Sequence, residues 1–209
     1  MPWDTAEIEG RAEEFRREHG AQPGGSIVAL ARRALGPSGV SPAMHSGLVV
    51  NDAALVWEYG SPKILVRPKL GAQPWRVAWG VAHELGELIL ERAGYREVNV
   101  EQVANGLAAA LLMPREEFSA AYAAHGFDLA TLAGEFCAPQ GAAALRIGEV
   151  TDEPVVLVTA SRVHRRDALE QLPDDEMLYL LSRVPRVPRP LSRHILTDVR
   201  RVVAFHLAA

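Results

Sequence analysis

Residues 74–92 read PWRVAWGVAHELGELILER and carry the strongest helical pattern of the chain. A proline suits the first position of a helix, and apolar residues then recur at the spacing of one helix face. Residues 99–114, NVEQVANGLAAALLMP, predict a second helix that ends before a proline. These two helices decide the expected fold, because both offer long apolar surfaces to a core and both carry residues that can bind a metal.

The segment His83-Glu84-Leu85-Gly86-Glu87 lies inside the first of these helices. Residues four apart share a helix face, so His83 and Glu87 can reach one ion. Glu84 points sideways from them, where the glutamate of H-E-x-x-H enzymes acts as a general base. Taken alone, the motif also suits a helix with a solvated acidic face, so its context must decide.

The rest of the chain predicts an α+β fold that is mainly helical. Short β-type runs between Val40 and Pro68, separated by Asn-Asp and Gly-Ser-Pro turns, indicate a small antiparallel sheet. A further strand is expected over residues 154–161, which are rich in valine. Additional helices are predicted at residues 6–19, 27–35, 115–124, 128–136, 140–150 and 191–207.

This reading gives three expected parts. Residues 1–125 would form the main domain, residues 126–152 a helix-turn-helix-like helical pair packed on it, and residues 153–209 a C-terminal extension with a strand and a basic helix. Such a helical pair is more often plain packing than a DNA-binding unit, and both readings stay open at this point.

Composition narrows the class of protein. The chain has 209 residues, a formal charge of −4 and a single cysteine, Cys137, which excludes an internal disulfide and a cysteine-built zinc site. Residues 4–17 are heavily charged, unlike the apolar segment of a signal peptide, and no run of about 18 apolar residues occurs. We therefore expect a cytoplasmic protein with no membrane partner.

Nucleic acid is not the partner that the charge distribution favours. The C-terminal arginines are read as a solvated or ion-paired face, with a nucleic-acid surface as the alternative. They are Arg183, Arg186, Arg189, Arg193, Arg200 and Arg201.

The context of the motif resembles a known family. Glu101-Gln-Val-Ala-Asn105 and the residues up to Pro114 are similar to the E-x-x-A-N/D-x-F-A-x-x-L-L-M-P segment of ImmA/IrrE-type metallopeptidases. Arg76 to His83 resembles that family's R-x-x-x-x-x-A-H-E approach, Ile64 to Pro68 its preceding strand, and Leu129 to Arg146 its following helices. The resemblance implies a zincin-like fold and a metal-dependent endopeptidase.

Carried onto this chain, the resemblance implies a role for each residue of the site. His83 and Glu101 would be metal ligands, Glu84 the general base, and Asn105 a partner that orients a ligand. Glu87 stands where the family has its second histidine, and glutamate is an acceptable zinc ligand. The other reading of Glu101 and Asn105 is capping and solvation at a helix N-terminus.

The substitution at Glu87 changes the expected chemistry. Two carboxylates would cancel the charge of a divalent ion and weaken it as a Lewis acid. Zn²⁺ is still the expected metal, and Mn²⁺ is the alternative because the site is rich in oxygen ligands. Gly80 also departs from the threonine common in the family, and Gly106-Leu107 replaces x-Phe; both are read as packing changes.

Three functions follow from the sequence. The first is an endopeptidase that cleaves a protein substrate, by family resemblance a helix-turn-helix transcriptional repressor or an antitoxin. The second is a catalytically impaired relative that binds a regulatory protein without hydrolysis, which the loss of one histidine favours. The third is an interaction protein unrelated to the family.

Overall fold

The computed structural model describes residues 3–43, 52–68, 73–97, 99–151, 155–159, 191–196 and 202–207. The chain divides into two compact units, one made of Met1–Phe118 with Gly134–Pro139 and the other of Ser119–Ala133 with Gln140–Ala209. The helices α5 (Arg115–His125) and α6 (Leu129–Glu135) each begin in one unit and end in the other. The expected three-part division stays a prediction.

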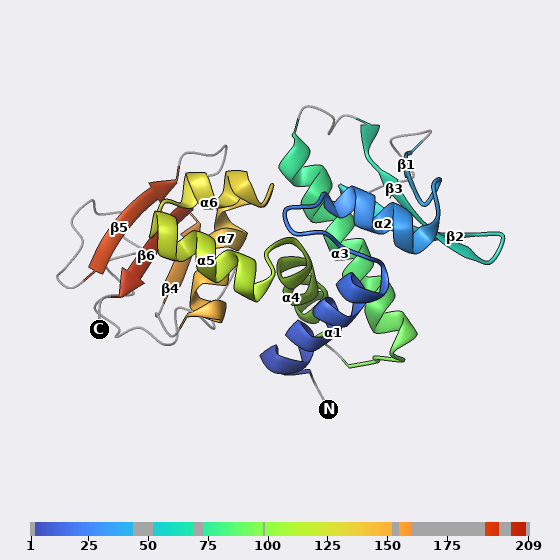
Figure 1. Cartoon of the computed structure of the whole chain (residues 1–209), viewed down its shortest axis with the longest axis horizontal. Coiled ribbons are helices and arrows are strands. Elements are labelled where there is room, and N and C mark those ends of the chain that lie inside the picture. The colour runs from blue at the N-terminus through green and yellow to red at the C-terminus, as the bar shows by residue number, and fades with distance from the viewer. Residues whose placement is uncertain are drawn as a thin grey trace. The chain divides into compact units, whose positions relative to one another are not determined.

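The core of the first unit is a pair of helices, α3 (Pro74–Arg92) and α4 (Val100–Leu112). These two helices pack on each other more extensively than any other pair of elements (Figure 1). Their apolar stripes are buried, as the periodicity predicts, with Leu85 and Leu88 facing the core from α3 and Leu107 from α4. Two further helices complete this unit, α1 (Thr5–Glu18) against α4 and α2 (Ile27–Leu35) against α3.

A three-stranded sheet packs on α3. It consists of β1 (Val40–Pro42), β2 (Ala53–Glu58) and β3 (Ser61–Val66) in the order β1-β3-β2. The hairpin β2-β3 is antiparallel as expected, but β1 pairs with β3 in parallel, so the sheet is mixed. Parallel strands need a long connection between them, and here the chain from β1 to β3 includes β2. The run 47–51, which also looked β-like, lies outside the described residues.

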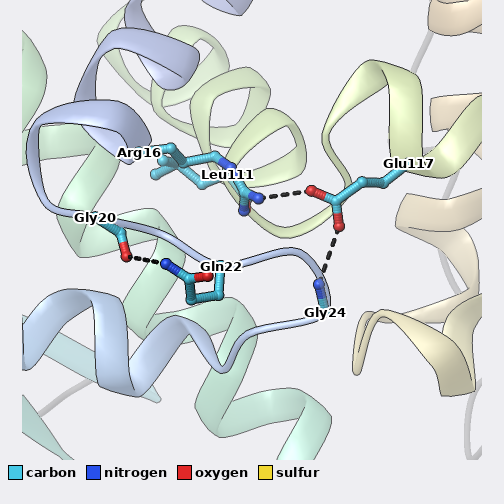
Figure 2. Close-up of polar contacts among 6 residues, drawn as sticks. All are labelled: Arg16, Gly20, Gln22, Gly24, Leu111 and Glu117. Carbon is cyan, nitrogen blue, oxygen red and sulfur yellow. Dashed lines mark hydrogen bonds and ion pairs between the residues drawn. The ribbon is translucent and has the colours of Figure 1, made fainter.

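A partly buried arginine joins α1 to the end of α4 and the start of α5. Arg16 donates from Nη1 to the carbonyl oxygen of Leu111 at 3.0 Å and from Nη2 to Oε1 of Glu117 at 2.7 Å (Figure 2). The other carboxylate oxygen of Glu117 accepts the amide of Gly24 at 3.1 Å. The guanidinium thus satisfies a carbonyl in the last turn of α4 and neutralises the negative end of that helix.

The second unit contains α7 (Gln140–Val150) and a second sheet. The sheet has the antiparallel order β4-β6-β5, made of β4 (Val155–Thr159), β5 (Leu191–Leu196) and β6 (Val202–Leu207). The helices of the expected pair and the strand after them are confirmed. Whether the pair acts as a helix-turn-helix module stays a prediction.

The helix expected over residues 191–207 is wrong. Residues 191–196 and 202–207 instead form the antiparallel strands β5 and β6, in which Ile195 pairs with Val203, and β6 also pairs along β4. The apolar residues of this segment fit a helix face by spacing, but the segment is rich in β-branched side chains, and a neighbouring strand supplies hydrogen bonds that override the pattern. Of the C-terminal arginines, only Arg193 falls within the described residues.

Among the residues that the structure describes, no helix combines the length and the apolar character that a membrane span requires.

Candidate metal centre

The imidazole of His83 is held between two sets of oxygen atoms. Its Nδ1 lies 3.1 Å from Oδ1 of Asn105, and its Nε2 lies 3.6 Å from a carboxylate oxygen of Glu87 and 3.6 Å from one of Glu101. Glu87 is one turn along α3, whereas Asn105 and Glu101 are one turn apart on α4. The two helices therefore bring together four of the five residues that the motif and the resemblance singled out.

Asn105 decides which nitrogen of His83 faces the carboxylates. An amide oxygen can only accept a hydrogen bond, so it selects a proton on Nδ1 and leaves Nε2 as the nitrogen that could coordinate a metal. This is how outer partners of metal-binding histidines usually fix the tautomer and the ring orientation. The geometry accords with the orienting role that the resemblance implies for Asn105.

The three candidate ligand atoms fit the size of a zinc site. One atom each from His83, Glu87 and Glu101 lies within 4.8 Å of the other two. Tetrahedral zinc with bonds of about 2.1 Å places its ligands about 3.4 Å apart, close to the two distances of 3.6 Å from Nε2. One nitrogen and two oxygen donors leave a fourth position open, as catalytic zinc sites require.

Without a metal, the same atoms favour a protonated histidine. The contact with the Glu87 carboxylate raises the pKa of His83, partial burial opposes this, and the charges of Glu84, Glu87 and Glu101 raise it further. The same contact lowers the pKa of Glu87. Metal and proton therefore compete for Nε2.

Glu84 is the one buried acidic residue among those described, with 6% of its surface exposed. Its Oε2 accepts a hydrogen bond of 2.6 Å from the backbone amide of Leu55 in β2. Burial, and after it the charge of Glu87, raises the pKa of Glu84 to about 7, while the Leu55 amide opposes the rise. A carboxylate with a pKa near neutrality suits a general base.

A cavity of about 400 Å³ opens beside these groups. Its lining brings Glu84, His83, Glu101 and Asn105 together with the start of β2 and the first turns of α3. The other lining residues are Asp52, Ala53, Arg67, Arg76, Trp79 and Gly80. Glu84 and two of the candidate ligands thus face a common space, as a reaction would require.

Sequence reasoning missed the ion pair at the edge of this cavity. Arg76 donates from Nε to Oδ2 of Asp52 at 2.7 Å and from Nη2 to Oδ1 at 2.5 Å. Arg76 was singled out only as part of the family resemblance, and Asp52 only as a turn residue. A sequence carries no signal that pairs them, because the hairpin β2-β3 and a loop separate the two positions.

Two glycines let the elements approach closely enough to build the site. A Cβ atom at Gly86 would lie 2.8 Å from the carbonyl oxygen of Ala104, so glycine permits the close crossing of α3 and α4. A Cβ atom at Gly80 would lie 3.0 Å from Cβ of Ala53, so glycine there lets β2 lie against α3. The structure thereby gives a packing reason for the departure at Gly80.

A two-helix centre with one histidine, two carboxylates and a buried glutamate beside it, next to a small mixed sheet, defines a metallopeptidase-like domain. Residues 52–148 match the model of the peptidase M78 family, described as the IrrE N-terminal-like domain. This part of the chain therefore matches the ImmA/IrrE family, as the motifs of the sequence indicated.

Solved structures show the same fold. Nine chains match, among them a Mycobacterium tuberculosis transcriptional regulator with a TM-score of 0.60 and 14% sequence identity, over 97% of this chain and 76% of that chain. At this identity the likeness concerns the fold alone. The comparison with curated proteins gave no match.

Proposed function

We propose that this protein is a metal-dependent endopeptidase of the ImmA/IrrE type, with Zn²⁺ as the expected ion and Mn²⁺ as the alternative. One observation carries the proposal. Ligand atoms of His83, Glu87 and Glu101 lie within 4.8 Å of one another, and the buried Glu84 lines a cavity with two of them.

The residues of the site have separate tasks in this proposal. His83, Glu87 and Glu101 hold the metal, and Asn105 keeps Nε2 of His83 available to it. When bound, the ion supplies a Lewis acid that polarises the scissile carbonyl and favours ionisation of water. Glu84 takes the proton from the attacking water and passes it to the leaving amine, a task for which a pKa of about 7 suits it.

The proposed substrate is a protein, such as a helix-turn-helix transcriptional repressor or an antitoxin. Support comes from the family resemblance and from the fold that the chain shares with a transcriptional regulator, which accords with a role in regulation. Nucleic acid and membranes are not proposed as partners.

One observation favours a second candidate function. Glu87 and Glu101 both face Nε2 of His83 and can satisfy a protonated imidazole without any metal. A chain that uses this arrangement permanently would be a catalytically impaired relative that binds a regulatory protein without hydrolysis.

A calorimetric zinc titration of three proteins, purified without a histidine tag, separates the two candidates. If Glu87 is a working ligand, Glu87→Ala should weaken zinc binding by more than about 100-fold, since outer partners alone contribute about 10–100-fold. Glu87→His should bind at least as tightly as the wild type. Cleavage of a protein substrate should disappear in Glu84→Gln, which keeps all three ligands.

The impaired relative predicts another pattern. The wild type would bind zinc weakly, Glu87→Ala would change nothing, and only Glu87→His would gain tight binding. Equal and tight affinity in all three proteins would show that Glu87 is no ligand.

A further inference from the structure

One face of α3 is fastened to β2 at successive turns. Arg76 pairs with Asp52 through two hydrogen bonds, and Glu84, two turns further along α3, accepts the amide of Leu55. Residues four and eight positions apart lie above one another on a helix, so both contacts belong to one stripe. Gly80 is the position between them, where an added Cβ atom would lie 3.0 Å from Cβ of Ala53 in β2.

The amide of Leu55 is available to Glu84 because of the place of β2 in its sheet. Among the residues that the structure describes, the strand order is β1-β3-β2, so β2 is an edge strand with a strand partner on one side only. An edge strand leaves one row of amide and carbonyl groups without a strand partner. Leu55 uses its outward amide on the carboxylate of α3, at 2.6 Å.

The ion pair fixes where that amide lies. Asp52 is three residues before Leu55, a span of about 10 Å in an extended strand. The pair between Asp52 and Arg76 is bidentate and about two-thirds buried, with 27% and 35% of the side chains exposed. Bidentate pairs add geometric specificity to their energy, so the start of β2 is held at one register along α3.

We propose that Asp52 and Arg76 are positioning residues for Glu84. Their pair sets the register of β2 on α3 and thereby keeps the Leu55 amide on the Glu84 carboxylate, which fixes the direction of that carboxylate in the cavity. The significance for catalysis rests on the proposed function, in which Glu84 is the general base.

Hydrogen exchange and the chemical shift of the Leu55 amide provide the test. In metal-free, ¹⁵N-labelled full-length protein, Asp52→Ala should speed hydrogen exchange at Leu55 by about tenfold or more and move its amide proton upfield. The amide of Ile64, which donates to the carbonyl of Gly39 at 2.8 Å within the same sheet, should keep its exchange rate. Glu84→Ala supplies the reference for a fully lost contact.

Two more variants separate positioning from general stability. Asp52→Glu keeps a carboxylate for Arg76 and should restore most of the wild-type Leu55 signal. Lys63→Ala removes the ion pair with Glu58, which has a 3.0 Å contact on the same hairpin, and should leave Leu55 unchanged. The inference is overturned if Leu55 is insensitive to Asp52→Ala, or if Leu55 and Ile64 accelerate equally.

The outcome is independent of the metal. A protein that binds neither zinc nor manganese but whose Leu55 amide responds to Asp52→Ala would refute the proposed function and leave the positioning contact standing. A protein whose cleavage depends on Glu84 but whose Leu55 amide ignores Asp52→Ala would keep the function and refute this inference.

Discussion

Gly86 offers the sharpest test of how the two helices build the site. A Cβ atom at this position would lie 2.8 Å from the carbonyl oxygen of Ala104 and 3.2 Å from Cβ of Leu107. The nearest atom belongs to the backbone of α4, so no side-chain rotation can relieve the contact. In Gly86→Ala, α3 and α4 must therefore separate by about 0.6 Å to reach an ordinary contact of 3.4 Å.

The expected cost follows from two opposing effects. Overpacking in a core costs about 1–3 kcal/mol, whereas replacing glycine by alanine inside a helix gains about 1 kcal/mol. The free energy of unfolding should therefore fall by up to about 2 kcal/mol. The same separation would lengthen the 3.1 Å contact between His83 and Asn105 beyond hydrogen-bond range, so zinc affinity should fall by about 10-fold or more.

Urea unfolding followed by circular dichroism measures the first effect, and calorimetric zinc titration the second. Gly10→Ala is the matched control, because Gly10 lies inside α1 with no atom within 4 Å of the added Cβ, and it should raise stability by up to about 1 kcal/mol. The reasoning is refuted if Gly86→Ala is as stable as Gly10→Ala and binds zinc like the wild type.

Two further predictions concern backbone strain and pH. Tyr59 is fully exposed in the β2-β3 turn and has a φ of 50°, followed by Gly60 with a φ of 79°, as in a type I′ turn. Because asparagine tolerates a positive φ better than tyrosine, Tyr59→Asn should raise Tm by about 2–4 °C in a thermal melt. A lower Tm would contradict this reasoning. Burial raises the pKa of Glu84 from 4.5 to about 7, so between these pH values the folded, metal-free protein holds a proton that the unfolded chain has released, and stability falls as pH rises. The free energy of unfolding should drop by up to about 3 kcal/mol from pH 5 to pH 7.5. The drop should be smaller in Glu84→Gln. The control Glu91→Gln changes an exposed residue of the same helix and should show the same drop as the wild type.

The sequence predicts the helices of the first unit well because their packing is decided locally. Pro74, Leu85 and Leu107 sit where a helix start and two apolar stripes require them, and the observed ends of α3 and α4 agree with the prediction to within a residue or two. The hairpin over residues 191–207 was missed for the opposite reason. Its strand β6 pairs with β5 and also with β4, which lies more than forty residues earlier in the chain, and no local pattern records that partner.

The candidate site likewise combines features that follow from the local sequence with features that depend on distant parts of the chain. That His83 and Glu87 share a face follows from helix geometry alone, whereas the resemblance was needed to bring in Glu101 from α4. The contact of Glu84 with Leu55 joins an edge strand to a helix, so it depends on the register of the sheet. Such a contact can be inferred only once the fold is known.

At residue 87, the helix geometry allows either histidine or glutamate as a ligand, but the two side chains differ in their chemistry. Either glutamate or histidine at this position can reach the ion, since reach depends only on the four-residue spacing. The carboxylate, however, also stabilises a proton on Nε2 of His83, whose pKa it raises more than any other group does. Zinc must displace that proton, so affinity should fall as pH drops below the pKa of His83. In the proposed metal centre, Glu87 would therefore supply a ligand and at the same time stabilise the proton that the metal has to displace.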